Sequence, residues 1–521
     1  MKEKLMKRLF LLFAIIMVIV AIVIVKKQGE NQPKQIEQQA VANNCITELK
    51  IGISSLDTFD PIVSNNKNVQ DVCKLIYEPL LTVDENYKIK GVLATEWAKT
   101  DNKSYIIKLK QGVKWHDGNE FTAADVFFTI NKIKQTESSI YLSNVQNIYQ
   151  VTIIDNYTIR LELFNDEAFF EYNLIFPIES SKDYSTEAKT IVSGTGLYKI
   201  YQIDSNKIEL TRNQYKENIE EVKIKTIIIK NYATMGELYN DFKIGNIDVL
   251  NTDNINYSNY IGTLGYTSKS FYGRNFNFLA LNTKNPALYN VEVRRAISYA
   301  IDKNLIVSNI YNNKYYVANY PLDYGNWLYS SENTSSGYNP EQSQKVLEEN
   351  GWQYKNDVWQ KEIDNKMVQL KFTLLVNSND ESRIKVAENI KEQLENVGIK
   401  VNISKVSSIN SYLENKNYEI ALIEMSMGIS PNLDTFFGYN NLANYENQEA
   451  ISIIEEIKET NDEHALKEKY DKLFEIYKTD IPYISLYFDS SALIYNSKMI
   501  GTITPTWYNL YYNIENWRVE I

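Results

Sequence analysis

The clearest hydrophobic pattern in the chain lies between residues 91 and 133. Within 103–115, apolar side chains occupy alternate positions, which is the period of a strand with one buried face. Gln111-Gly112 and Asp117-Gly118 then supply turn residues. From residue 123 the apolar positions recur at helical spacing, and Thr122 with Asp125 resembles a capping box at the helix start. The pattern predicts a strand, a turn and a helix whose apolar face carries Ala123, Val126, Phe127, Ile130 and Ile133.

Short alternating segments dominate the rest of the chain before residue 280. They predict strands at 45–53 and 220–230, a hairpin over 151–163, and a further strand after Gly194-Thr195-Gly196. Strands of this kind need a second layer on which to bury their apolar face.

Helical spacing becomes more frequent after residue 280. Residues 290–301 predict one helix, and Asn339-Pro340 supplies the N-cap and first-position proline of another, which ends at Gly351. Residues 372–403 have the pattern of a strand, a helix and a second strand, the βαβ unit of a partly parallel sheet. The chain is therefore expected to be an α/β protein with more than one unit, as a length of 521 residues also suggests.

The first 27 residues differ from this globular pattern. Seventeen uninterrupted apolar residues, 9–25, follow Lys2, Lys4, Lys7 and Arg8, and they could just cross a bilayer as one helix of about 25 Å. No small-residue cleavage site stands at the end of the run, which favours an uncleaved transmembrane anchor over a cleaved signal peptide. Residues 28–44 are rich in Gln and Asn and predict a flexible tether. The remaining chain would then be extracytoplasmic.

Charge and cysteine content narrow the function only slightly. The net charge is −11 and no long basic run is present, so nucleic acid is not an expected partner. An extracytoplasmic location would permit a disulfide between Cys45 and Cys73, and two separate thiols are the alternative.

Motifs for catalysis or metal binding are missing from the sequence. There is no nucleophile elbow, phosphate loop, H-E-x-x-H or C-x-x-C, and the two histidines, His116 and His464, stand alone. A transition-metal site normally draws on His and Cys clusters. We therefore expect a binding protein with no catalytic residues, no metal and no cofactor.

Several segments together resemble one known family. The stretch at 93–130, LATEWAKTDNKSYIIKLKQGVKWHDGNEFTAADVFFTI, resembles the hallmark segment of the family 5 extracellular solute-binding proteins, the oligopeptide and dipeptide receptors of ABC importers. Further segments agree in order: DP at 60–61, IYEPLL at 76–81, GTGLY at 194–198, ALNT at 280–283, VRRAISYAID at 293–302, YNP at 338–340 through GW at 351–352, and PYISLY at 482–487. The similarity covers roughly residues 45–521.

The resemblance implies a two-lobed, periplasmic-binding-protein-like fold of type II, cluster C, preceded by the transmembrane helix. Lobe I would comprise 45–280, including an inserted α+β subdomain at about 66–183, and the chain would return to it over 486–521. Lobe II would comprise 281–485. The chain crossings near 281–283 and 485–489 would form a hinge that closes on ligand.

The resemblance also implies where ligand binds. In peptide-binding members an aspartate of the second lobe receives the free amino group, and here Asn432 stands in its place. Asp434 could take that role, or it could only cap a helix begun at Thr435. Arg274 could pair with a carboxylate end or form a surface ion pair. The expected ligand-binding residues are Ser64, Asn65, Tyr272, Arg274, Asn275, Ser426, Asn432 and Asp434.

The function expected from this resemblance is that of a membrane-tethered, monomeric receptor that binds peptides between its lobes and delivers them to ABC permease subunits. The alternatives are the same fold with another solute, such as a nickel chelate or an oligosaccharide, and a tethered peptide sensor without transport.

Overall fold

The computed structural model of the chain describes residues 45–182, 192–204, 206–330 and 337–520. The anchor expected at 1–27 and the tether at 28–44 lie outside these ranges. Over the ranges that are described, no helix combines the length and the apolar character needed to cross a membrane.

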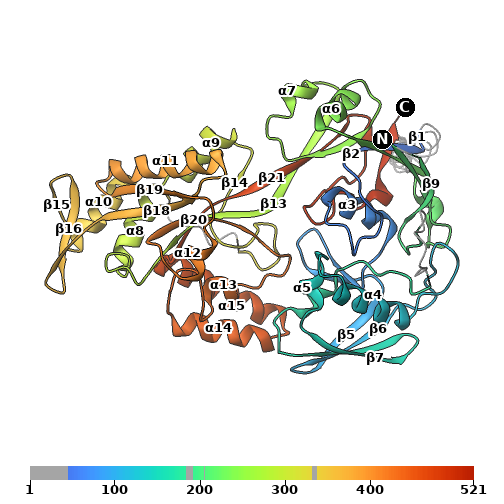
Figure 1. The fold of residues 1–521 in the computed structure, drawn as a ribbon, viewed down its shortest axis with the longest axis horizontal. Helices are drawn as coiled ribbons and strands as arrows, with labels where there is room; N and C mark the ends of the chain where they lie inside the picture. The colour runs from blue at the N-terminus through green and yellow to red at the C-terminus, as the bar shows by residue number, and fades with distance from the viewer. Residues whose placement is uncertain (1–44, 183–191, 205, 331–336, 521) are drawn as a thin grey trace, which may run out of the picture.

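One continuous sheet runs through both lobes of the molecule (Figure 1). Its strands, in spatial order, are β19 (Lys400–Val406), β18 (Lys371–Asn377), β20 (Ile420–Ser426), β13 (Tyr266–Leu281), β21 (Tyr483–Asn496), β12 (Val249–Thr252), β2 (Glu48–Ser54), β11 (Thr226–Tyr232), β10 (Lys207–Arg212) and β9 (Tyr198–Asp204), with β14 (Tyr316–Val317) paired to β21. The long strands β13 and β21 pair antiparallel and extend from one lobe into the other. They carry the chain from the first lobe to the second and back again.

The first lobe is built on the parallel strands β12, β2 and β11. It also contains α3 (Lys67–Ile76), α6 (Met235–Lys243), α7 (Ser258–Ile261), η2 (Ile219–Glu221), η3 (Ile514–Asn516), and the strands β1 (Cys45–Ile46), β22 (Met499–Ile500) and β23 (Arg518–Glu520). Strand β11 begins at Thr226, later than the expected 220, because residues 219–221 form a 3₁₀ turn. Cys73 of α3 is a free thiol buried in the core of this lobe.

A smaller α+β unit holds the stretch that dominates the sequence pattern. Its elements are β3 (Leu81–Val83), β4 (Ile89–Gly91), β5 (Ala94–Asp101), β6 (Ser104–Leu109), α4 (Ala123–Gln135), α5 (Leu142–Val145), β7 (Ile148–Asp155), β8 (Thr158–Leu163) and η1 (Phe170–Leu174). The predicted strand, turn and helix are confirmed, and the Asp125 carboxylate accepts a hydrogen bond from the Thr122 N–H at 2.9 Å. Phe127, however, is 42% exposed, because it lies at the edge of the apolar face of α4.

The Gly194-Thr195-Gly196 segment is shaped by close backbone packing. A Cβ on Gly194 would lie 1.9 Å from the carbonyl oxygen of Ile76 at the end of α3, so no larger residue fits. His116 clamps the same segment, since its Nδ1 accepts from the Gly194 N–H at 3.1 Å and its Nε2 lies 3.2 Å from the Gly196 carbonyl oxygen. Burial lowers the pKa of His116 to about 4. His116 is thus a neutral structural residue.

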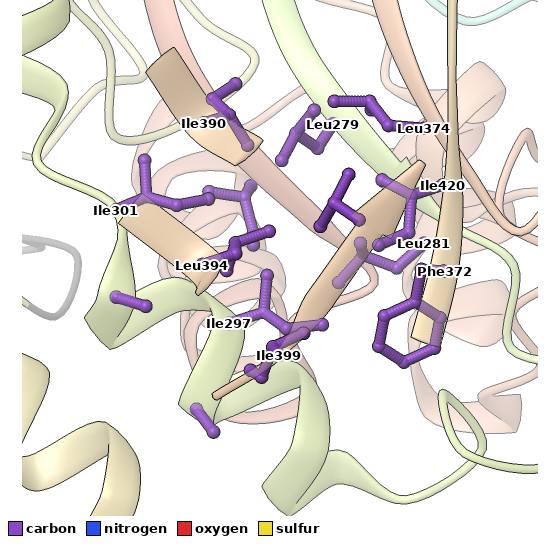
Figure 2. Close-up of a cluster of buried hydrophobic side chains, with 14 of the residues drawn as sticks. Leu279, Leu281, Ile297, Ile301, Phe372, Leu374, Ile390, Leu394, Ile399 and Ile420 are labelled. Carbon is purple, nitrogen blue, oxygen red and sulfur yellow. The ribbon is translucent and has the colours of Figure 1, made fainter. Parts of the chain in front are cut away.

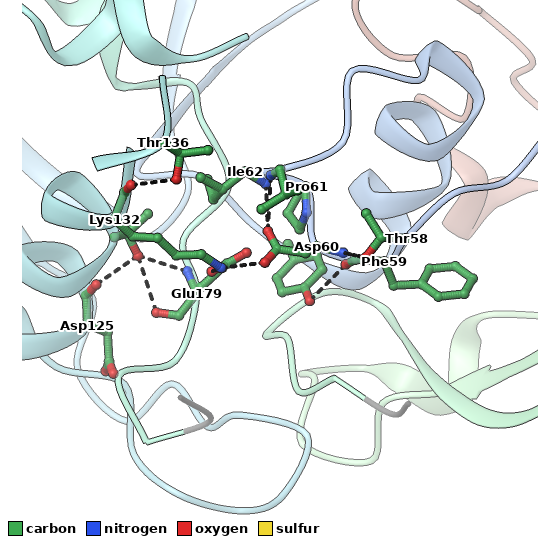
Figure 3. A network of polar contacts seen from close by, with 12 residues as sticks. Thr58, Phe59, Asp60, Pro61, Ile62, Asp125, Lys132, Thr136 and Glu179 are labelled. Atoms are coloured by element: carbon green, nitrogen blue, oxygen red, sulfur yellow. Dashed lines mark hydrogen bonds and ion pairs between the residues drawn. The ribbon is translucent and has the colours of Figure 1, made fainter. Parts of the chain in front are cut away.

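An ion-pair network fastens α4 to the loop between β2 and α3 (Figure 3). Lys132 Nζ lies 2.5 Å from Asp60 and 2.6 Å from Glu179, and Asp60 also accepts from the Ile62 N–H at 3.0 Å. These bonds hold the Asp60-Pro61 turn in place and give that sequence motif a structural role.

The second lobe packs helices on both faces of β18, β19 and β20 (Figure 1). Its helices and remaining strands are α8 (Val291–Ala300), α9 (Lys303–Tyr311), α10 (Pro340–Glu349), β15 (Gln353–Lys355), β16 (Val358–Ile363), β17 (Lys366–Gln369), α11 (Glu381–Asn396), α12 (Asn410–Glu414), α13 (Asp434–Phe437), α14 (Gln448–Glu459) and α15 (Glu463–Asp480). The predicted helices at 290–301 and 340–350 and the βαβ unit are confirmed. Figure 2 shows Leu279, Ile297, Phe372, Ile390 and Ile420 meeting in the core that joins the sheet to α8 and α11.

Arg294 gives the VRRA segment of α8 (residues 293–296) a structural role. Its guanidinium is buried and donates to the carbonyl oxygens of Leu288, Tyr289, Asp480 and Ile481. It therefore fastens α8 to the end of α15, next to the start of β21.

Candidate functional site between the lobes

A pocket lies where β13 and β21 pass between the lobes. Its walls come from the turn between β3 and β4, from both crossing strands, from the C-terminal segment, and from two loops of the second lobe, 321–326 and 427–433. The lining residues are Tyr87, Gly273, Arg274, Pro321, Leu322, Asp323, Asn326, Met427, Gly428, Ile429, Ser430, Pro431, Asn432, Leu433, Phe488 and Trp507. The cavity they enclose measures about 30 Å³, which is room for about one water molecule.

Arg274 reaches the pocket from a bulge in β13. The register with β21 shifts between Tyr272 and Phe276, which turns the intervening residues out of the regular ladder. The guanidinium lies 5.1 Å from the ring centroid of Trp507, and its Nε donates to the carbonyl oxygen of Met427 at 3.1 Å. Partial burial lowers the pKa of Arg274, but the group stays charged.

Asn275 and Asp489 fix the shape of this bulge. The Asp489 carboxylate accepts from the backbone N–H and from the side-chain amide of Asn275, each at 2.9 Å. The carboxylate rests directly against Gly273, where a Cβ would lie 2.0 Å from Asp489 Oδ1. A larger residue at position 273 would therefore displace this carboxylate.

Tyr87, Phe488 and Trp507 are the aromatic residues of the wall, and further rings pack beside them. Tyr272 stacks on Tyr316 with ring centroids 4.0 Å apart and meets Phe488 edge-on at 6.0 Å. Tyr87 stacks on Trp507 at 6.3 Å. Tyr87 is buried and has a φ of +62°, an outlier for a bulky residue that directs attention to a functional role.

Asp323 enters the pocket from the loop that follows β14. Its Oδ1 accepts from the Gly325 N–H at 2.8 Å, and its carboxylate is hydrogen-bonded to the Tyr87 hydroxyl across the lobe boundary. Burial raises the pKa of Asp323 to about 6, because too few donors compensate for the lost hydration.

The sequence-predicted residues divide between this pocket and other places. Arg274 and Asn432 line it, Tyr272 and Asn275 lie beside it on β13, and Ser426 pairs with Asn275 at the end of β20. The other three residues do not line it. Ser64 is buried and donates to Asp57, Asn65 is exposed in the same loop, and Asp434 is exposed at the first position of α13. The helix expected to begin at Thr435 thus begins one residue earlier.

The sequence did not identify Tyr87, Asp323 and Trp507 as site residues. They are distant in the chain and belong to no shared motif. The available signals were the turn-rich sequence around Asp323 and the aromatic residues of the C-terminal segment. Within the described parts of the chain, no three His, Cys, Asp or Glu side chains converge in a metal site. The pocket offers charge, hydrogen-bonding groups and aromatic surface, which suit binding of an organic solute.

Comparisons with known proteins agree with this two-lobed architecture. The sequence model of the bacterial extracellular solute-binding proteins, family 5, middle region, matches residues 88–448. The oligopeptide-binding protein AppA of Bacillus subtilis is 24% identical over 491 residues, which cover 88% of this chain and 89% of AppA.

Solved structures are similar over nearly their whole length. The periplasmic murein tripeptide binding protein MppA, in an unliganded open form, gives a TM-score of 0.78 at 16% identity, covering 91% of this chain and 98% of MppA. NikZ of Campylobacter jejuni, in complex with Ni(L-His), gives 0.60 at 23% identity, covering 90% and 99%. At these identities the structural matches establish the two-lobed fold and leave the solute open.

Proposed function

Because the chain belongs to family 5 of the bacterial extracellular solute-binding proteins, we propose that it captures short peptides between its lobes and delivers them to an ABC importer. Members of this family are solute-binding receptors, and no chemical step on the solute is proposed. The names of two relatives support peptides as the solute class. AppA is an oligopeptide-binding protein, and SapA of Haemophilus influenzae is a peptide transport periplasmic protein.

The observation that carries the proposal is the composition of the interlobe pocket. Its walls include Tyr87 and Trp507 from the first lobe, Asn326 and the 427–433 loop from the second, and Arg274 from the strand that joins them. A solute that contacts both lobes stabilises the arrangement in which they face each other. The loop backbone can hydrogen-bond to peptide groups of any sequence, and the Arg274 Nη groups, which form no hydrogen bond within the described residues, can receive a carboxylate.

Entry of a peptide requires the lobes to separate. A cavity of about 30 Å³ is far below the roughly 300–1,000 Å³ of ordinary ligand pockets. Ile429 of the second lobe packs among Tyr87 and Trp507 of the first. Around the pocket the lobes are joined by an ion pair between Lys88 and Glu463 at 2.6 Å and by a hydrogen bond from the Trp327 N–H to the Asn86 carbonyl oxygen at 2.9 Å. Rotation about β13 and β21 would break these contacts and open the pocket.

Three further parts of the proposal come from the sequence. Residues 1–27 would anchor the receptor in the membrane by one helix, residues 28–44 would act as its tether, and the globular part would work outside the cytoplasm as a monomer. The two lobes would move as separate bodies whose boundaries lie at about residues 280 and 485. The inserted unit would span about residues 66–183.

A nickel chelate is the second candidate, because NikZ was solved with Ni(L-His). Neither histidine of this chain lines the pocket, so the metal would have to arrive with its own ligands.

Thermal melting of the purified extracytoplasmic part, residues 45–521, tests both candidates. We expect a defined set of di- to pentapeptides to raise the melting temperature, as any ligand selective for the native state does, and Ni(L-His) to leave it unchanged. A rise with Ni(L-His) alone would replace the peptide proposal by the chelate. No rise with any peptide would refute peptide capture.

A further inference from the structure

A second pocket lies on the second lobe. Its sheet side is formed by Thr373 and Leu375 of β18 and by Ser404 of β19, and its other walls come from α12 and from the segments that precede β20 and follow β13. The pocket measures about 480 Å³, which is within the range of ordinary ligand pockets. Among the described residues, none lines both this pocket and the interlobe pocket, so the two are separate candidates for binding.

Unequal cover on the two faces of β18 and β19 leaves this space. One face packs through Phe372 and Leu374 against α11, which is 16 residues long. The other face lies toward α12, which has only 5 residues and reaches the core through Tyr412 and Leu413. The two helices lie on opposite sides of the strands (Figure 1). The polar residues of the second face are therefore only partly covered.

The charged residues of the lining are balanced within the protein. Lys284 pairs with Glu446 at 2.7 Å. The two charges that remain, Lys416 and Glu419, are of opposite sign. Lys416 Nζ donates to the carbonyl oxygen of Asn441 at 2.6 Å, and the Glu419 carboxylate accepts from a backbone N–H of β18 at 2.7 Å. An ionic solute would lose its hydration here without gaining an unpaired counter-charge.

Hydroxyl and amide groups are what the second pocket offers to a ligand. The side chains of Thr373, Ser404, Tyr412 and Asn417 line it and form no hydrogen bond to another described residue. Three of them carry hydroxyls, which both donate and accept, and the fourth carries an amide with groups of both kinds. A purely apolar ligand would strip these groups of water without replacing the hydrogen bonds, which is costly. A matching ligand is therefore neutral and rich in hydrogen-bonding groups.

We propose that the second pocket binds a neutral saccharide of one or two rings. Sugar hydroxyls donate and accept in the same way as the hydroxyls of the lining, and the Glu419 carboxylate retains acceptor capacity for further hydroxyls. Tyr412 is half-buried, so its ring offers a face on which the C–H groups of a sugar can pack. The site is independent of the proposed peptide capture, and a peptide and a saccharide should bind to the same chain together.

Calorimetric titration of the purified protein tests the proposal. The probes are glucose, galactose, N-acetylglucosamine, maltose and cellobiose, each with and without a saturating tripeptide. We expect at least one of these saccharides to bind with a Kd of about 1 mM or tighter, at one saccharide per chain, and with the same Kd when the tripeptide is present.

Four variants locate the bound saccharide. Tyr412→Ala, which loses the ring and the hydroxyl, should weaken binding at least about 10-fold. Tyr412→Phe keeps the ring, and it should weaken binding only about 5-fold, as should Ser404→Ala, because each loses one hydrogen bond. Ser411→Ala is the matched control at an exposed residue of α12 outside the lining, and it should bind as the wild type does. Melting curves of the unliganded variants show whether each is folded.

Three results overturn the assignment. They are the failure of every saccharide of the panel to bind, competition between the saccharide and the tripeptide, and equal affinities of Tyr412→Ala and Ser411→Ala for the saccharide. Each of these results leaves peptide capture intact, because the melting shift with peptides tests that function separately.

Discussion

Replacing Asp323 by Asn should make the unliganded protein more stable. The amide has nearly the same shape and can still accept from the Gly325 N–H and the Tyr87 hydroxyl, but it carries no charge to desolvate. Burial raises the pKa of Asp323 from 3.8 to about 6. A difference of about two pKa units corresponds to about 3 kcal/mol, which is the upper limit of the expected gain in the free energy of unfolding.

The size of this effect depends on pH. The raised pKa means that the folded state disfavours the ionised carboxylate, so the cost is present in full above pH 6. Below about pH 4 the carboxyl is protonated in both states and the cost disappears. The stability gap between Asp323→Asn and the wild type should therefore be largest at neutral pH and should close as the pH falls from 6 to 4.

Urea unfolding followed by tryptophan fluorescence at pH 7.5, 5 and 4 measures this gap. Asp434→Asn, at an exposed carboxylate, serves as the matched control and should stay within about 0.5 kcal/mol of the wild type at each pH. If Asp323→Asn is no more stable than the wild type at pH 7.5, or if the gap does not narrow in acid, the carboxylate is not desolvated as described.

Three further predictions concern the structural residues behind the sequence motifs. Burial lowers the pKa of His116 from 6.5 to about 4, so the wild type loses free energy of unfolding as the pH falls through that window. His116→Gln should remove up to about 3 kcal/mol of this loss. Identical pH profiles of the two proteins between 6.5 and 4 would contradict this. Gly194→Ala should destabilise the protein by at least about 3 kcal/mol in urea unfolding, because its Cβ meets a backbone oxygen. Gly236→Ala in α6, where a Cβ would meet only Thr234 Oγ1 at 3.9 Å, should be neutral or slightly stabilising. Equal effects would count against the packing argument. Arg294→Lys should cost about 3 kcal/mol in the same assay, because one ammonium cannot reach both the carbonyl groups just before α8 and those at the end of α15. A loss below about 0.5 kcal/mol would show that the fork is not needed.

Local features of the fold could be predicted from the sequence because neighbouring residues determine them. The strand at β6, the cap at Thr122 and the helix begun by Asn339-Pro340 all depend on contacts within a few positions, and all three are confirmed. The start of β11 was misplaced because the apolar pattern continues through a 3₁₀ turn that only tertiary packing distinguishes from a strand.

The pocket depends on contacts that no local pattern encodes. Tyr87 and Asp323 meet across the lobe boundary although more than two hundred residues separate them in the chain. Sequence reasoning gave weight to Asp434 because it stands beside Asn432, yet proximity in sequence does not bring it into the pocket lining. Arg274 was identified because it precedes the predicted hinge, where strands of the family approach the ligand.

Amide hydrogen exchange of residues 45–521, with and without a saturating tripeptide, tests the central claim most directly. A peptide held between the lobes should slow exchange at 84–88 in the first lobe and at 321–326 and 427–433 in the second, at a stoichiometry of one peptide per chain. Protection confined to one lobe, or protection away from these segments, would contradict binding in the interlobe pocket.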